Sequence, residues 1–280
     1  DSAVREAKAP GAVAYIGDLE HIHAHVAVGA RQLVPEVHPA ELNTVYDLAS
    51  VTKVLATTTA IMLLRESGSI DLEAAVSKYL PVPAFGKFTV RHCLTHTAGL
   101  NPGKPFYTEC NTIDAMLERY AAMPLNWPPG TRWLYSDVGF MILGRIVENV
   151  SGKTLDAFCQ ERIFTPLDMK DTRFNPPADW AVRCAATEQC PWRGTMMIGQ
   201  VHDENTYAVG GVAGHAGLFS TAPDIAIYLR ALLTGKTLKS DSVDMIIHKA
   251  NFAGLPGFEG AAAFGALAAG GAAGFFRRRV

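Results

Sequence analysis

The sequence Ser50-Val51-Thr52-Lys53 opens a predicted helix over residues 47–65 and places a lysine three positions after a serine. Three residues along a helix bring two side chains onto one face, one turn apart. Free N–H groups at the helix start favour negative charge developing on Ser50, and a partly desolvated Lys53 ammonium lowers the cost of removing its proton. A plainer alternative fits the same residues, with Ser50 capping the helix and Lys53 lying along the surface.

A second motif, Tyr135-Ser136-Asp137, follows 82 residues after Lys53, behind the turn sequence 128–131 and ahead of a predicted helix over 137–150. Together the two motifs resemble the serine β-lactamase and penicillin-binding-protein superfamily, especially its class C-type branch and the family VIII esterases. Three further stretches match that family in order and spacing: Leu94-Thr95-His96-Thr97-Ala98-Gly99-Leu100, Ile163-Phe164-Thr165-Pro166-Leu167-Asp168-Met169 and Gly210-Gly211-Val212-Ala213-Gly214-His215-Ala216-Gly217-Leu218-Phe219-Ser220-Thr221. The resemblance covers about residues 10 to 250.

The resemblance implies roles for three residues. Ser50 would be the nucleophile that carries the acyl group, and Lys53 would lower its pKa. Tyr135 would act as general base with Lys53 and later protonate the leaving group, which a phenol does only when a cation stabilises its anion. The backbone N–H of Ser50 would form half of an oxyanion hole. A core tyrosine with a satisfied hydroxyl is the alternative for Tyr135.

Two departures from the family pattern affect the expected substrate. The second motif usually ends in Asn, whereas this chain has Asp137, which accepts hydrogen bonds but has no N–H for a substrate carbonyl. This favours esters over β-lactam amides. The family's third motif, of the K-T-G or H-T-G type, has no match after residue 220. Gly214 and His215 only superficially replace it, and we expect the glycine in a tight loop and His215 lining a substrate-binding site.

The implied fold class is α/β (α+β), with an antiparallel sheet flanked by helices beside a mostly helical region. Residues 1–65 and 200–280 would form the sheet side, residues 66–199 the helical side, and the active site would lie between them. A hairpin is predicted from strands at 12–16 and 21–28, and a further helix at 223–233.

Composition excludes several classes of protein. With 49% hydrophobic residues, 19% charged residues and a net charge of −2, the chain has a full core and no signature of a nucleic-acid partner. No apolar run is long enough to predict a membrane span. The motifs G-x-S-x-G, H-E-x-x-H and the P-loop are absent, and neither a metal nor an organic cofactor is implied. Asp1 in place of Met indicates trimming, so the bacterial periplasm and the cytoplasm both stay open.

Several polar residues and the cysteines have two interpretations each. Alternation on the second strand places three histidines on one face: His21, His23 and His25. They could hold a metal, but we expect a solvent-facing strand edge, because this alternation is typical of a half-buried strand. His202-Asp203-Glu204 could be an acid–base or metal cluster, but we expect a solvated polar loop. We expect His96 to organise a helix start rather than to do chemistry. Five cysteines without a C-x-x-C pair indicate buried thiols, with a Cys184–Cys190 bridge as the alternative.

The last twenty residues differ in composition from the rest. Residues 261–280 contain eight Ala, four Gly and three consecutive Arg at 277–279, a low-complexity pattern. We expect this tail to lack the strands that the family places at the C-terminus, as an out-of-frame or replaced terminus would. The sheet would then keep an unpaired edge and favour a homodimer.

Three functions fit these features. The leading hypothesis is a serine hydrolase that forms an acyl-enzyme with small carboxylic esters, with weak or no β-lactam hydrolysis. The second is a β-lactamase or D-amino-acid peptidase, acting on amides. The third is a catalytically impaired penicillin-binding-like protein. By the resemblance, the missing third motif would supply the other N–H of the oxyanion hole, and the loss of one such donor lowers the rate ~10²–10³-fold.

Overall fold

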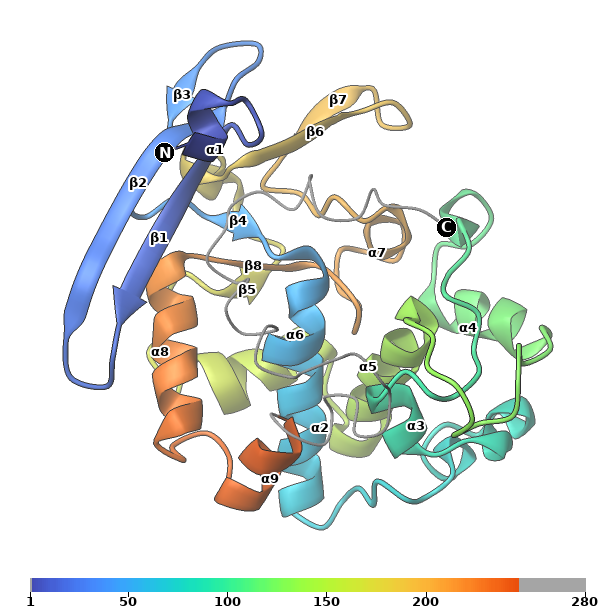
Figure 1. The fold of residues 1–280 in the computed structure, drawn as a ribbon. Helices are drawn as coiled ribbons and strands as arrows, with labels where there is room; N and C mark the ends of the chain where they lie inside the picture. The colour runs from blue at the N-terminus through green and yellow to red at the C-terminus, as the bar shows by residue number, and fades with distance from the viewer. Residues whose placement is uncertain (1, 247–280) are drawn as a thin grey trace.

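The computed structural model describes residues 2–246 as helices packed around short antiparallel sheets (Figure 1). Its strands are β1 (Gly11–Gly17), β2 (Ile22–Gln32), β3 (His38–Pro39), β4 (Tyr46–Asp47), β5 (Arg173–Phe174), β6 (Ala186–Cys190), β7 (Thr195–Ile198) and β8 (Leu218–Ser220). Its α-helices are α1 (Ser2–Arg5), α2 (Thr59–Glu66), α3 (Val90–Leu94), α4 (Ile113–Ala121), α5 (Asp137–Ser151), α6 (Leu155–Cys159), α7 (Glu204–Ala208), α8 (Ala222–Leu233) and α9 (Ser240–Asp244). The predicted tail at 261–280 lies outside the described residues.

The predicted N-terminal hairpin is confirmed. Strands β1 and β2 pair antiparallel from Gly11 opposite Gly29 to Ile16 opposite Ala24, with a bulge before Gly17. Strand β3 pairs on the other side of β2, in the order β1-β2-β3. Among the described strands, β1 therefore forms an edge of this sheet, and α8 packs against it.

A second small sheet joins parts of the chain that are far apart in sequence. Strand β8 lies between β4 and β5, so that Asp47 pairs with Phe219 and Phe174 pairs with Leu218. This pairing brings the residues just before Ser50 beside the glycine-rich segment that ends at β8. Strand β5 has only two residues, too few to show alternation, so the sequence does not predict it.

Two of the three principal helix predictions are confirmed, and the third is wrong at its start. Helix α5 begins at Asp137 and ends at Ser151, where Gly152 adopts a left-handed conformation with φ +69°. Helix α8 matches its predicted range within one residue. The helix predicted over 47–65 is different, because Asp47 belongs to β4 and regular α-helix starts only at Thr59.

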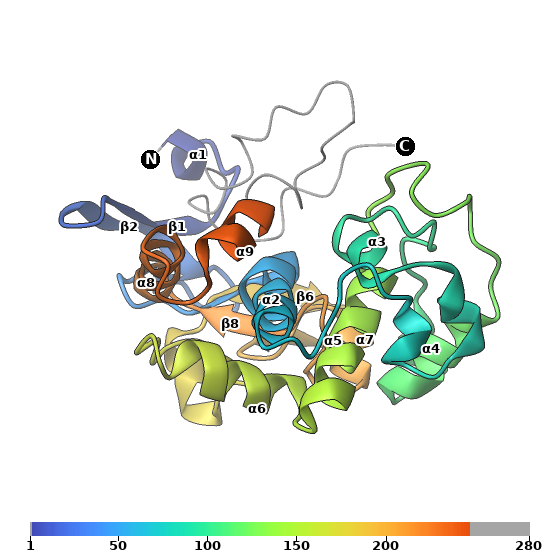
Figure 2. The same cartoon turned by 90° about the horizontal axis from the view of Figure 1, so that it is seen from below.

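Helix α2 runs through the middle of the molecule, with α8 and α9 on one side and α5 on the other (Figure 2). One continuous apolar core includes side chains of α2, α5, α6 and α8. The hairpin and α8 occupy one side and α3, α4 and α5 the other (Figure 1). The division into residues 1–65 with 200–280 and residues 66–199 stays a prediction, and β5 of the second range pairs with β8 of the first.

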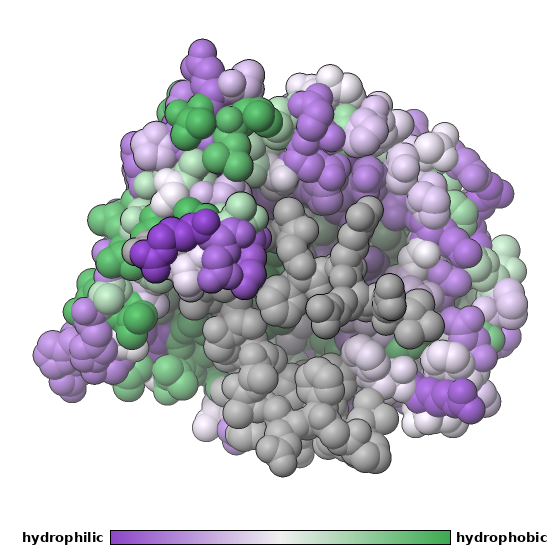
Figure 3. All heavy atoms as spheres, turned by 45° about the horizontal axis from the view of Figure 1, so that its top comes forward, coloured by the Kyte–Doolittle hydropathy of each residue, from purple (hydrophilic) through white to green (hydrophobic). Residues whose placement is uncertain are grey.

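Apolar side chains are exposed mainly over the N-terminal sheet, on the left of Figure 3. They are Ile16, Leu19, Ile22, Val26, Leu33, Val34, Val37 and Leu42. No helix within residues 2–246 has both the length and the apolar character to cross a bilayer. All five cysteines are free and buried, as expected, and Cys184 and Cys190 do not form a bridge.

Candidate active site

The segment before and after Ser50 is irregular and tightly held. Ala49 has φ +44°, a left-handed conformation that costs energy for a residue with a side chain. Its N–H donates to Asp47 Oδ1 at 2.8 Å, and its carbonyl accepts from Thr52 Oγ1 at 2.6 Å. A 3-10 turn over Ala49–Val51 then leads into π-helical turns over Lys53–Thr58. These contacts keep the chain in a conformation that a regular helix would not allow.

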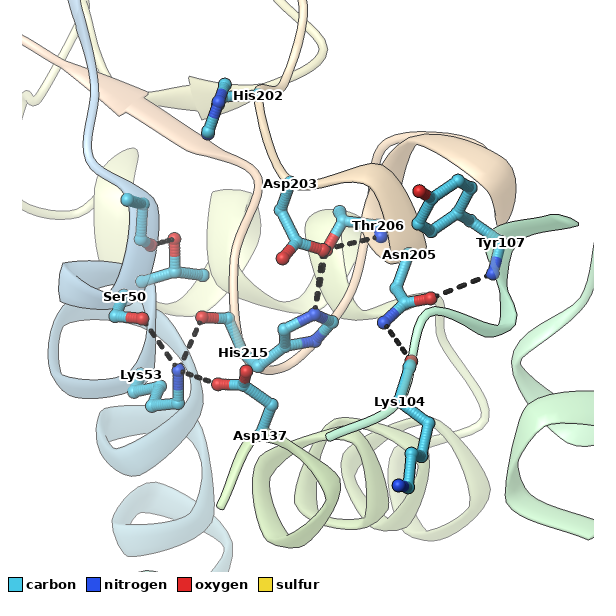
Figure 4. Close-up of polar contacts among 12 residues, drawn as sticks. Ser50, Lys53, Lys104, Tyr107, Asp137, His202, Asp203, Asn205, Thr206 and His215 are labelled. Carbon is cyan, nitrogen blue, oxygen red and sulfur yellow. Dashed lines mark hydrogen bonds and ion pairs between the residues drawn. The ribbon is translucent and has the colours of Figure 1, made fainter. Parts of the chain in front are cut away.

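Lys53 is 3% exposed, and its ammonium has three hydrogen-bonding partners. Its Nζ lies 2.9 Å from Ser50 Oγ, 2.7 Å from Asp137 Oδ1 and 3.0 Å from the backbone oxygen of His215 (Figure 4). An ammonium has three N–H donors and no acceptor, so these partners match its capacity. The structure thus brings together the two motifs and the glycine-rich segment at a single nitrogen.

Tyr135 lies beside this cation, with Lys53 Nζ 4.8 Å from the centre of its ring. The His96 ring packs against two aromatic rings, with its centre 4.6 Å from that of Tyr135 and 5.2 Å from that of Phe140. Burial first, and then the nearby Lys53 charge, lower the pKa of His96 to about 4. The imidazole is therefore neutral at pH 7.

His96 also organises the start of α5, as predicted. Its Nδ1 accepts a hydrogen bond from the Ser136 N–H at 3.0 Å. Ser136 is the N-cap residue of α5: its hydroxyl accepts from the Gly139 N–H at 3.4 Å and donates to the Asn101 carbonyl at 2.7 Å. These contacts fix the turn that directs Asp137 toward Lys53.

His215 is 1% exposed, and both its backbone and its ring are bonded. The ring Nε2 lies 2.9 Å from Asp203 Oδ1 and 3.1 Å from Thr206 Oγ1. Gly214 packs on α5, where an added Cβ would lie 2.0 Å from the Phe140 carbonyl, and its own carbonyl accepts from Thr57. A substrate-binding role for Gly214 and His215 stays a prediction.

The segment His202-Asp203-Glu204 is held by hydrogen bonds to the rest of the fold, although the His202 side chain is 41% exposed. Asp203 is the N-cap of α7 and accepts from the Thr206 N–H at 2.7 Å, and the His202 N–H donates to the buried Asp47 at 2.7 Å. These contacts were not predicted; Asp203, a residue type favoured at the N-cap of a helix, was the available signal.

The structure holds the N-terminal histidines apart from this site. His23 contacts Asp18 at 2.9 Å, and the His25 ring packs against Tyr15. Across residues 2–246, no group of three His, Cys, Asp or Glu side chains has the geometry to hold a metal ion.

A family model described as Beta-lactamase matches residues 1–274 of the sequence. The chain belongs to this family. The superfamily resemblance expected from the two motifs is thereby confirmed, as is the β-lactamase-like fold. Members of this fold family are serine hydrolases, which agrees with the geometry around Ser50.

Individual relatives agree with this assignment. A protein of Salmonella agona (strain SL483), named "Putative D-alanyl-D-alanine carboxypeptidase", is 38% identical over 231 residues, or 71% of this chain and 53% of the relative. The chain thus spans about half the length of the curated relatives it matches.

Solved structures share the fold. The octameric penicillin-binding protein homologue from Pyrococcus abyssi aligns with a TM-score of 0.71 at 24% identity, over 87% of this chain and 57% of that one. EstCE1, a hydrolase with promiscuous acyltransferase activity, aligns with a TM-score of 0.72 at 23% identity, over 89% of this chain and 74% of that one.

Proposed function

We propose that this protein is a serine hydrolase that forms an acyl-enzyme on Ser50 with small carboxylic esters and hydrolyses β-lactams weakly or not at all. The observation that carries the proposal is the 2.9 Å contact between Ser50 Oγ and the buried Lys53 Nζ. A buried lysine whose charge is paired and whose three donors are used is typical of a functional site rather than of a surface residue. The alternative of a snorkelling Lys53 is therefore not favoured.

In the proposed acylation step, Lys53 Nζ pairs with Asp137 and donates a hydrogen bond to Ser50 Oγ. Tyr135, acting as general base, takes the hydroxyl proton of Ser50. Ser50 Oγ bonds to the ester carbonyl carbon, and the bond to the leaving oxygen then breaks as Tyr135 returns the proton to it. In deacylation, water gives a proton to Tyr135 and its oxygen bonds to the acyl carbon; the bond from this carbon to Ser50 Oγ then breaks as Tyr135 returns the proton to Oγ, and the acid is released.

The preference for esters follows from Asp137. One of its oxygens accepts from Lys53, and its side chain is 33% exposed beside the site. A carboxylate cannot donate to the carbonyl of a substrate amide, and it repels that oxygen. An ester that is bound through its acyl chain does not need an N–H donor from residue 137, so Asp137 does not weaken its binding.

The test is pre-steady-state release of nitrophenol from p-nitrophenyl acetate, comparing the wild type with Ser50→Ala, with intact mass measured on quenched samples. We expect a burst and a mass increase of one acetyl group in the wild type, both absent from Ser50→Ala. Identical traces without an adduct would instead support the catalytically impaired alternative. Asp137→Asn sharpens the substrate class, because it should raise turnover of amides and β-lactams relative to the ester.

A second candidate function is a D-alanyl-D-alanine carboxypeptidase. It is supported by the curated relatives that carry this name at 37–38% identity. Release of D-alanine from a peptide ending in D-alanyl-D-alanine, absent from Ser50→Ala, distinguishes it from the ester reading.

We also propose a homodimer formed through the edge of the N-terminal sheet. Strand β1 is an edge strand among the described residues, and exposed apolar side chains such as Ile16 and Ile22 lie on this sheet. Light scattering during size-exclusion chromatography tests this, with Ile16→Lys expected to shift the mass to that of a monomer.

A further inference from the structure

The segment 202–206 is hydrogen-bonded to strand β4 and to the loop 104–107, besides its contact with His215. On one side, the His202 N–H donates to Asp47 Oδ2 at 2.7 Å, and Asp47 lies just before the 3-10 turn Ala49–Val51 that contains Ser50. On the other side, the Asn205 amide accepts from one backbone N–H and donates to one backbone carbonyl of the loop 104–107, at 3.0 and 2.9 Å. The segment 202–206 therefore connects Asp47 of β4 with the loop 104–107.

Between these two anchors, Asp203 points at the ring of His215 (Figure 4). The two side chains lie 2.9 Å apart, and the His215 side chain is 2% exposed while that of Asp203 is 30% exposed. Burial by itself would raise the pKa of Asp203, but the facing His215 and the hydrogen bonds from Thr206 outweigh it and hold this pKa well below its ordinary value. Such a charge-assisted pair fixes the orientation of an imidazole strongly.

The ring of His215 and the carbonyl that binds Lys53 belong to one residue. That carbonyl accepts from Lys53 Nζ at 3.0 Å, and the preceding carbonyl, of Gly214, accepts from Thr57 Oγ1 at 2.7 Å. Two further partners of the same ammonium are the Ser50 hydroxyl and Asp137. When the ring is held, the peptide plane cannot rotate freely, so the acceptor stays where the ammonium needs it.

We propose that Asp203 is a positioning residue for the reaction at Ser50. It holds the His215 ring, and through it the backbone oxygen that fixes the Lys53 ammonium against the Ser50 hydroxyl. This inference rests on the proposed function. The competing explanation is that Asp203 serves only as the N-cap of α7.

Two substitutions at this position separate the explanations. Asp203→Ser keeps an oxygen for the Thr206 N–H but is too short to reach the His215 ring. Asp203→Asn keeps both the cap and a carbonyl oxygen that accepts from the ring. A displacement of about 1 Å at a reacting group costs ~10²-fold in rate. We therefore expect Asp203→Ser to lower the acylation rate with p-nitrophenyl acetate by ~10²-fold, with KM little changed, and Asp203→Asn to recover most of this loss.

Thr112→Ala is the matched control, because Thr112 caps α4 by accepting from the Ala115 N–H and has no contact with Lys53 or His215 among the described bonds. Its acylation rate should equal that of the wild type. Wild-type acylation by a folded Asp203→Ser variant would overturn the proposal, as would equal losses in the Ser and Asn variants. A wild type that matches Ser50→Ala would overturn the proposed function and this inference together, whereas the first two outcomes leave the proposed function standing.

Discussion

Helix α5 and the segment from Asp47 to Thr58 both carry a residue of the proposed machinery near their start, yet they fold in opposite ways. Helix α5 is regular for fifteen residues, with nine of them buried, a serine cap and a glycine stop. The other segment changes from strand to 3-10 turn to π-helical turns within a dozen residues. The first presents Asp137 from its first turn, and the second presents Ser50 and Lys53 from its irregular part.

The hydroxyl groups of the irregular segment account for this contrast. Thr52 accepts from the Leu218 N–H, and Thr57 donates to the Gly214 carbonyl, both more than 150 positions along the chain. Buried hydroxyls require such partners. In α5 the buried side chains are mostly apolar and make no directional demand, so the backbone stays regular. Regular helix forms where local and tertiary preferences agree, and the chain departs from it where polar partners decide.

Lys53→Met, in the irregular segment, should have the largest effect on the acylation rate. Loss of the cation beside Ser50 and Tyr135 should lower the acylation rate ~10²–10⁴-fold. Met fills a similar volume and needs no acceptors, and the 33% exposed Asp137 can turn to water, so the free energy of unfolding should change by only about 1 kcal/mol. Burst kinetics and urea unfolding measure the two quantities. A normal burst in a folded Lys53→Met variant would contradict the assigned role.

The next effect concerns pH and the start of α5. Because the pKa of His96 is about 4 in the folded protein and about 6.5 when unfolded, the unfolded chain binds the proton first. Stability from this group is complete above pH 6.5 and falls as the pH drops toward 4, by up to about 1.4 kcal/mol per pH unit. His96→Gln keeps an acceptor for the Ser136 N–H and should lose this part of the dependence. Parallel stability curves for the two proteins between pH 4 and 7 would show that His96 is not responsible.

Gly144→Ala should destabilise the packing of the regular helix α5 by adding a methyl group where there is no room. A Cβ at this position would lie 2.9 Å from Gly214 Cα, which is backbone and cannot move without displacing the segment that binds Lys53. We expect a loss of about 1–3 kcal/mol in urea unfolding. Gly139→Ala, in the same helix, meets its nearest neighbour at 3.4 Å and is the matched control. Equal stability of the two variants would mean that the α5 contact with Gly214 is loose.

Ser136→Ala should have the smallest effect. It removes the N-cap of α5 and the donor to the Asn101 carbonyl, at a cost of about 1 kcal/mol in the free energy of unfolding. Thermal or urea unfolding measures it against Thr112→Ala, the equivalent change at α4. If Ser136→Ala costs no more than an exposed surface substitution, the cap does not set the start of α5.

Elements with local signals could be predicted from the residues alone. The alternation of the hairpin, the apolar period of α5 with its terminal Gly152, and the three-residue spacing of Ser50 and Lys53 all act over one or two turns of chain. The sequence also brought Lys53 and Tyr135 into one hypothesis, through the resemblance of their motifs. The hairpin, the helix and the Ser50–Lys53 spacing depend on neighbours that are close along the chain, so the residues alone contain them.

The partners of the buried polar groups could not be predicted in this way, because they depend on the folded chain. The carbonyl of His215 lies 162 positions from Lys53, and the pair of Asp203 with His215 joins two loops with no shared periodicity. The same long-range bonds replaced the predicted regular helix at 47–58 by strand and irregular turns. A buried donor or acceptor without a partner costs free energy, so each one is paired in the folded chain. Its partner is a group that lies near it in the fold and can be far away in the sequence.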